Sequence, residues 1–245
     1  MRFAMAISSP QLPGKTIHIR GTGVLDGTSA EMSFKLGSLF KQMGLPKGLG
    51  GAAPAQLLNG SIKEILLEQN GDYVVYMRIP FLSSQLPGGK AWLKLDLSKL
   101  GKSAGVDVGK LMSGNQLEPT DLLSMLKAEG AKVDKVGSAT IGGVATTKYR
   151  VTIDPAAALK ASGLTSPVFS SMAAKLKKTI TENVWIGKDG LVRRVALDYG
   201  VRAARLGMRM NLFDYGAHVA IAAPPSSQVF DMTQLAQHGL GGVGG

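Results

Sequence analysis

Apolar residues at every second position recur along most of the chain, and this alternation constrains the fold more than any other sequence feature. Met32, Phe34 and Leu36, for example, alternate with polar neighbours. Such a period of two is typical of strands with one buried face and one wet face. Asn70-Gly71 and the turn at 188–190 join neighbouring strand-like segments. These turns predict hairpins, and sequential hairpins make the sheet antiparallel.

Two stretches near the middle break the alternation. Residues 118–130 carry a polar start, a spaced apolar run and a terminal glycine, which indicates a helix. Two helices are indicated in the second stretch: Asp154 as an N-cap before Pro155 opens one at 155–163, and an apolar stripe marks another at 166–178. Strands resume after them, and the last expected strand is AHVAIAA at 217–223. The pattern predicts one α+β domain with about ten antiparallel strands, followed by a flexible tail at 232–245.

The composition excludes several classes of protein. The 245 residues are 44% hydrophobic and 18% charged, so the chain can bury a sizeable core. Cysteine is absent, which removes disulfides and thiolate chemistry. The net charge of +11 is first explained by an ordinary solvated basic surface. Among anionic partners, a membrane surface fits better than nucleic acid, because the basic residues are scattered and aromatic residues are few.

The motifs that could carry catalysis lack their context. Gly101-Lys102-Ser103-Ala104-Gly105 matches the G-x-S-x-G pattern, but the residues after it make a poor helix and no oxyanion segment exists. His18, His218 and His238 are far apart and belong to no metal-binding motif. We therefore expect no enzyme, no catalytic residue, no metal and no cofactor, and an esterase acting through Ser103 ranks last among the hypotheses.

Four segments, taken in order, resemble one known family. They are KAWLKLDLSKL at 90–100, the block from LEPTDLLSMLKAEG through KYRVTIDPAAAL at 117–159, ENVWIGKDGLVRRV at 182–195, and NLFDYGAHVAIAAPPSSQVFD at 211–231. The ordered set resembles the LppX/LprG-like lipoproteins of the actinobacterial cell envelope, which are related in fold to the LolA and LolB lipoprotein carriers. The segment at 38–60 matches nothing in that family.

The resemblance implies a specific architecture and location. It implies a strongly curved antiparallel half-barrel whose concave face is covered by two to four helices, forming a single LolA-like lipid-binding domain over residues 1–231. It also implies an exported protein of the cell envelope, anchored as a lipoprotein. Because the sequence contains neither a signal segment nor a lipobox cysteine, we expect both to have been removed from the chain as given.

A curved sheet must cover its apolar face, and acyl chains could supply part of the cover at about 0.8 kcal/mol for each buried CH2. We predict that strand residues on the apolar faces line a cavity and that helical residues close it. The strand set is Phe34, Leu36, Val75, Met77, Leu93, Leu95, Leu206, Met208 and Met210, and the helical set is Leu122, Leu126, Phe169, Met172 and Leu176. The alternative is that the same side chains meet in a solid core.

Two functions from different classes remain open. The first is a non-enzymatic carrier that binds lipid or acylated glycolipid and works near an anionic membrane surface. The second is a regulatory or scaffolding module of the envelope that binds another protein. A cavity too small for an acyl chain would favour the second function.

Overall fold

The computed structural model describes residues 1–12, 15–35, 60–80, 82, 86–103, 105–113, 131–154, 179–201 and 204–241. The chain divides into two compact units. Unit 1 contains Met1, residues 19–115 and residues 217–245, and unit 2 contains residues 2–18 and 116–216. The helices expected at 118–130 and 155–178, and most of the 38–60 segment, lie outside the described residues. The prediction of a single domain over 1–231 stays a prediction.

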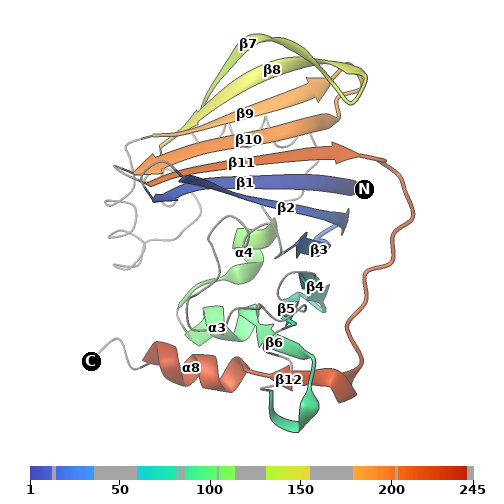
Figure 1. The fold of residues 1–245 in the computed structure, drawn as a ribbon, viewed down its shortest axis with the longest axis vertical. Helices are drawn as coiled ribbons and strands as arrows, with labels where there is room; N and C mark the ends of the chain where they lie inside the picture. The colour runs from blue at the N-terminus through green and yellow to red at the C-terminus, as the bar shows by residue number, and fades with distance from the viewer. Residues whose placement is uncertain are drawn as a thin grey trace. The chain divides into compact units, whose positions relative to one another are not determined.

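Twelve strands are joined by hydrogen bonds in the order β12-β6-β5-β4-β3-β2-β1-β11-β10-β9-β8-β7 (Figure 1). Their bounds are β1 Arg2–Leu12, β2 Lys15–Asp26, β3 Ser29–Lys35, β4 Ser61–Gln69, β5 Asp72–Arg78, β6 Trp92–Asp96, β7 Lys132–Ile141, β8 Val144–Ile153, β9 Ile180–Gly187, β10 Val192–Val201, β11 Ala204–Phe213 and β12 Val229–Asp231. Every pairing with a described register is antiparallel except that of β12 with β6, which is parallel. The predicted, mostly antiparallel sheet is confirmed, with twelve strands rather than about ten.

The predicted hairpin turns are present and have the expected backbone geometry. Asn70 and Gly71 have φ angles of 54° and 82° between β4 and β5. Positive φ at both central residues is the signature of the type I′ turn, whose twist matches that of the flanking strands. Gly190 has a φ of 78° in the turn between β9 and β10. These turns set the registers of both hairpins.

In unit 1, the strands bury side chains on both faces. One face carries a cluster of buried residues, namely Ile65, Leu67, Val74, Tyr76 and Trp92. The intervening residues of β5, Tyr73 and Val75, are also buried, at 5% and 8% exposure. Burial on both faces explains why YVVYM reads as a continuous apolar run instead of an alternation.

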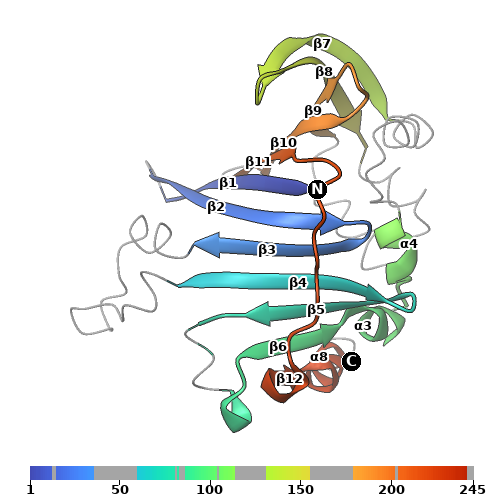
Figure 2. The same ribbon diagram turned by 90° about the vertical axis from the view of Figure 1, so that its right-hand side faces the viewer.

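The C-terminal segment covers the clustered face of unit 1. Ile221 and Val229 pack against the cluster, and Figure 2 shows the segment crossing the strands of this unit. The expected strand at 217–223 is wrong, because these residues join no ladder. Pro224 and Pro225 follow directly and lack the N–H donors that a ladder needs. The segment instead pairs later, as the short strand β12.

Unit 2 has one clearly buried face. Val151 and Val184 are 0% exposed and Val192 is 2% exposed, and these β-branched side chains come from three neighbouring strands. Phe3 at 2% and Leu212 at 3% face each other across β1 and β11. The N-terminal residues thus form strand β1, with Phe3 and Met5 on its buried side.

The described helices lie in unit 1. They are α3 (Leu97–Ser103), α4 (Val108–Ser113) and α8 (Thr233–Gly241), and the 3-10 turns are η2 (Pro87–Gly89) and η3 (Ser226–Gln228). Asp96 Oδ1 accepts a hydrogen bond from the Lys99 backbone N–H at 2.9 Å and so caps α3. Helix α8 occupies residues that the sequence assigned to a flexible tail. It is held because Thr233, 4% exposed, accepts a hydrogen bond through Oγ1 from the Asp96 backbone N–H at 3.0 Å.

Candidate functional site

Cross-strand register places one set of apolar side chains on a single face of β3 to β6 in unit 1. We call this set the apolar face of unit 1, and it comprises Met32, Phe34, Ile62, Leu66, Val75, Met77, Leu93 and Leu95. Val75 is buried, whereas the other members are only half-buried. Five residues predicted to line a cavity, Phe34, Val75, Met77, Leu93 and Leu95, therefore share one face.

Unit 2 has a corresponding set on β1, β11, β10, β9 and β8. We call it the apolar face of unit 2, and it comprises Phe3, Met5, Ile7, Met208, Met210, Leu212, Val195, Leu197, Val184 and Val151. Its members differ in exposure, since Val184 is fully buried while Ile7, Leu197 and Met208 are half-buried. The predicted residues Met208 and Met210 belong to it.

The remaining predicted site residues cannot be placed. Leu36, Leu122, Leu126, Phe169, Met172 and Leu176 lie outside the described residues. Leu206 belongs to β11, but its side chain is not among those described. Whether these residues close a cavity stays a prediction.

Each apolar face contains one glutamate that sequence reasoning did not single out. In unit 1, Glu64 stands between Met32 and Met77 across the strands, and in unit 2 Glu182 stands between Leu197 and Val151. Burial raises the pKa of both carboxyls above the ordinary value of 4.5.

Neither carboxyl has a hydrogen-bond or ion-pair partner within the described part of the chain. The sequence signal was available, because Glu182 alternates with Ile180 and Val184 and so occupies an apolar position. An acid without a partner on an apolar face favours its neutral form and can hydrogen-bond a polar group of a ligand.

The opposite face of unit 2 is polar and basic. We call it the basic face, and we define it by Lys148, Arg150, Trp185, Arg194 and Arg209, which lie on β8 to β11. Lys148 Nζ lies 5.1 Å and Arg194 Cζ lies 5.7 Å from the centre of the Trp185 ring. These are cation–π distances. Arg194 Nε also donates to Asn211 Oδ1 at 2.7 Å.

A tyrosine and an arginine meet beside the basic face. Arg193 Cζ lies 5.2 Å from the Tyr215 ring centre, and the Tyr215 hydroxyl donates to the Val192 carbonyl oxygen. Burial raises the pKa of Tyr215 to about 12, so the phenol is neutral and acts as a donor. Its role is structural, because the bond ties the segment after β11 to β10.

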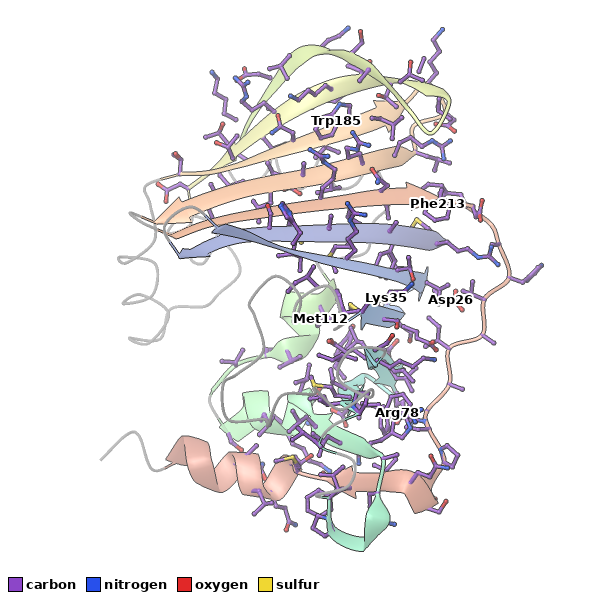
Figure 3. The ribbon with its side chains drawn as sticks, viewed as in Figure 1. Asp26, Lys35, Arg78, Met112, Trp185 and Phe213 are labelled. Atoms are coloured by element: carbon purple, nitrogen blue, oxygen red, sulfur yellow. The ribbon has the colours of Figure 1, made fainter. Side chains whose placement is uncertain are left out.

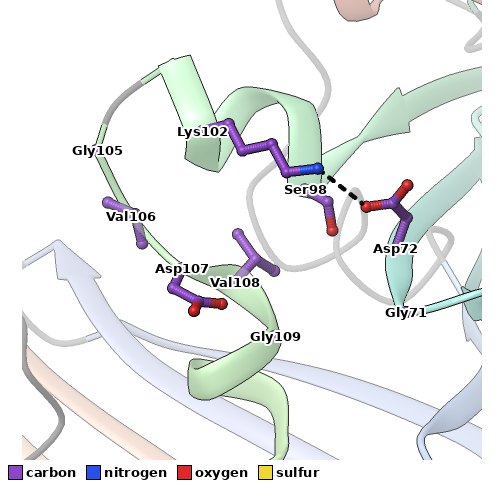
Figure 4. A pocket seen from close by; sticks show the side chains of 9 residues that line it. All are labelled: Gly71, Asp72, Ser98, Lys102, Gly105, Val106, Asp107, Val108 and Gly109. Atoms are coloured by element: carbon purple, nitrogen blue, oxygen red, sulfur yellow. Dashed lines mark ion pairs between the residues drawn. The ribbon is translucent and has the colours of Figure 1, made fainter.

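One pocket of unit 1, of about 390 Å³, lies between α3, α4 and the β4–β5 turn (Figure 4). Lys102 Nζ and Asp72 Oδ1 face each other across it at 3.6 Å. The Ser98 hydroxyl lies in the wall of the pocket and accepts a hydrogen bond from the Tyr73 backbone N–H at 2.9 Å. This hydroxyl is therefore already engaged in holding α3 against β5. Among the described residues of the lining, no nucleophile lies beside a base.

Ser103 does not sit on a nucleophile elbow. It is the last residue of α3, whereas an elbow places its serine between a strand and a following helix. Its hydroxyl donates to the Lys99 carbonyl oxygen at 3.1 Å and accepts from Gln237 Nε2 at 3.0 Å. The G-x-S-x-G match at 101–105 thus belongs to the junction of α3 with α8.

Within the described residues, no group of three His, Asp or Glu side chains is arranged to hold a metal ion. No helix in the described ranges combines the length and the hydropathy required to cross a bilayer.

Comparison with known proteins finds similar structures but no close relative. No protein-family model matches the chain. No curated protein matches it either. Lipoprotein LppX of Mycobacterium tuberculosis is 15% identical with a TM-score of 0.43, over 90% of this chain and 89% of that one. LprF of Mycobacterium bovis is 13% identical with a TM-score of 0.43, over 92% and 90%. A LolA-superfamily protein of Nitrosomonas europaea is 9% identical with a TM-score of 0.27, over 87% and 86%.

The four sequence segments resemble the LppX/LprG-like lipoproteins, and a lipoprotein LppX and a LolA-superfamily protein are among the similar structures. At such low identity and TM-score, however, the functions of those proteins do not transfer to this chain. A function for this chain must be inferred from the residues of the chain itself.

Proposed function

We propose that this chain is a non-enzymatic carrier that binds the acyl chains of a lipid or acylated glycolipid in the bacterial cell envelope. The observation that carries the proposal is the incomplete burial of the two apolar faces. Large flexible side chains such as Met32, Met77 and Met208 stay half-buried there. Each Å2 of apolar surface left wet costs roughly 25 cal/mol, so these faces favour an apolar ligand.

The composition of the faces suits acyl chains. Methionine is unbranched and polarisable, and it adapts to partners of irregular shape. Met32 and Met77 flank one glutamate in unit 1, and Met208 and Met210 extend the apolar face of unit 2. In this proposal the cavity lies within a half-barrel, and the segments predicted as helices at 118–130 and 155–178 close it. Loading and release need only a change of conformation, not a reaction.

The buried glutamates suggest which polar groups the ligand carries. A neutral or desolvated carboxyl prefers a hydroxyl or amide donor over a phosphate, since a phosphate beside it would repel its charged form. We therefore propose that Glu64 and Glu182 face hydroxyl-bearing parts of the ligand. The protein would be exported and would work next to an anionic membrane, as an anchored lipoprotein.

Native mass spectrometry of the purified protein, followed by lipid extraction, tests the proposal. We expect discrete added masses that extract as acylated lipids. Met77→Gln and Met208→Gln place an amide on each apolar face and should lower the amount of bound lipid. The matched control is Leu235→Gln, because Leu235 in α8 is 59% exposed and lies on neither face.

The outcomes separate the two functions. A bare protein that also takes up no fluorescent fatty acid would overturn the carrier. It would favour the regulatory or scaffolding module that binds another protein. Bound lipid that is unchanged in the Met77 and Met208 variants, with their thermal stability intact, would show that the ligand lies elsewhere.

A further inference from the structure

The basic face of unit 2 is built from two neighbouring rows of residues paired across the strands. The first row runs Lys148, Trp185, Arg194 and Asn211. The second row runs Arg150, Asn183, Ala196, Arg209 and Ala6. Because paired residues on neighbouring strands lie ~5 Å apart, each row spans less than about 20 Å. Four cations thus share one small area of sheet.

None of these four cations has an acidic partner within the described part of the chain. The acids nearby are engaged elsewhere: Asp134 pairs with Lys132 at 3.1 Å, and Asp214 pairs with Arg2 at 3.3 Å. Asp198 falls on the same face one row further on, and its side chain is not among those described. Within the described residues, the four cations thus share this area without an ion pair, and Asp134 lies across from Arg150 on β7.

The pKa of Arg194 reflects the closeness of these cations. Burial lowers its pKa, and the positive charge of Arg209 lowers it further. The buried Asn183 Oδ1 in the second row also has no hydrogen-bond partner among the described residues. An anionic surface laid on this face would relieve the repulsion between the cations.

Aromatic side chains accompany the cations, and both aromatic residues are labelled in Figure 3. Trp185 lies in the first row. Phe213, at the end of β11, shares this face and is 41% exposed, which is unusual for so large an apolar residue. Cations mixed with Trp and exposed Phe are typical of proteins that sit at a lipid–water interface.

We propose that the basic face of unit 2 docks the protein on an anionic lipid bilayer, with Lys148, Arg150, Arg194 and Arg209 against the headgroups and Phe213 at the acyl boundary. A bilayer fits better than nucleic acid for a geometric reason. Base stacking needs a free ring, whereas Lys148 and Arg194 already lie over the ring of Trp185. The inference deepens the proposed function, because it names the surface by which a carrier would meet its membrane.

Co-sedimentation with vesicles tests the docking surface on the full chain. We expect binding to vesicles of phosphatidylglycerol and phosphatidylcholine in equal parts, little binding to phosphatidylcholine alone, and weaker binding as salt rises. Each basic residue near such a surface contributes about fivefold in affinity. The double variant R150Q/R209Q should therefore bind roughly 25-fold more weakly. Both arginines are exposed, so the substitutions should leave the fold intact.

The matched control is R20Q/R78Q, which removes the same charge from two exposed arginines of unit 1. It should bind within about twofold of the unaltered protein, since neither arginine belongs to the basic face. Phe213→Ser should weaken binding even at high salt, because its contribution is apolar. Tryptophan fluorescence gives a second readout, and a vesicle-induced blue shift should disappear in Trp185→Phe.

Equal losses in the two double variants would overturn the docking surface, because net charge alone would then explain binding. So would a loss of oligonucleotide binding in R150Q/R209Q with unchanged vesicle binding. Displacement from vesicles by inorganic phosphate, at an ionic strength where chloride has no effect, would identify a site for free anions instead. Lipid extraction from R150Q/R209Q keeps the two proposals separate, since this variant should retain its bound lipid.

Discussion

The two units differ in what their second sheet face does. In unit 1 the face opposite the apolar face is itself apolar, and Ile65, Val74 and Trp92 are buried there against the C-terminal segment. In unit 2 the corresponding face carries Lys148 and Arg194 around a half-buried Trp185. The same strand pattern thus produces a two-sided core in one unit and an open polar surface in the other.

Whether the second face of a strand is buried or exposed depends on what packs on it. Ile221 and Val229 cover the second face of unit 1, and backbone hydrogen bonds hold that segment in place. Gln228 accepts from the Ala91 N–H at 3.0 Å, and Lys94 accepts from the Met232 N–H at 2.9 Å. Among the described residues no such segment covers the second face of unit 2, where Arg150 and Arg209 are exposed.

The two tryptophans give the largest expected contrast between the units. Trp92→Ala should lower the free energy of unfolding by about 3–5 kcal/mol, because it empties a buried position in the cluster. Trp185→Ala should cost about 1–2 kcal/mol, since it removes partial burial and two cation–π contacts. Urea unfolding followed by circular dichroism measures both. Equal losses would contradict the two-sided core, and Trp→Phe at each site provides the conservative control.

The glutamates on the two apolar faces should make the stability of each unit depend on pH. A raised pKa means that the folded state binds its proton more tightly than the unfolded state. Stability is therefore higher below pH 4.5 and falls as pH rises through the folded pKa. Glu182→Gln should raise the melting temperature at pH 7 but not near pH 4. Glu64→Gln should act in the same direction by less, because Glu64 is less buried.

Thermal melts at the two pH values check this expectation. An E182Q variant that is less stable at pH 7 would show that the Glu182 carboxylate has a stabilising partner. An equal gain at both pH values would mean that charge is not the cause.

The smallest expected effect concerns the ion pairs that tether the C-terminal segments. Burial raises the pKa of Asp231, but hydrogen bonds from Thr233 and Lys94 outweigh it and lower the pKa to about 2. The resulting stability is present above the ordinary value of 3.8 and is lost as pH falls toward 2. Because half of the Asp231 side chain is exposed, Asp231→Asn should shift the melting temperature at pH 6 by only about 1–2 °C.

Asp214→Asn is the counterpart in unit 2, where Asp214 meets Arg2 at 3.3 Å and both side chains are about half exposed. It should change the melting temperature less, because no further hydrogen bond supports that pair within the described part of the chain. A larger shift in Asp214→Asn than in Asp231→Asn would contradict the assignment of the stronger tether to unit 1.

Much of the fold was predictable because local sequence patterns specify its turns and strands. Asn70-Gly71 and Gly190 mark hairpins through φ angles that few other residues adopt, and period two identifies strands and their apolar sides. Five predicted site residues on β3, β5 and β6 accordingly share a face. The prediction of a strand at 217–223 is wrong because alternation indicates an extended segment but does not show that this segment pairs with another strand. Glu64 and Glu182 were missed because polar residues were assigned to the wet face.

The antiparallel sheet, its turns and the sidedness of its strands follow from the sequence alone, since these depend on neighbours within a few residues. Only the tertiary structure decided which second face is covered and which stays open. That choice depends on contacts between residues more than a hundred positions apart, such as Trp92 with Val229 and Asp96 with Thr233. Local patterns carry no information about partners at such a separation, so the basic face of unit 2 became visible only when the strands were placed in register.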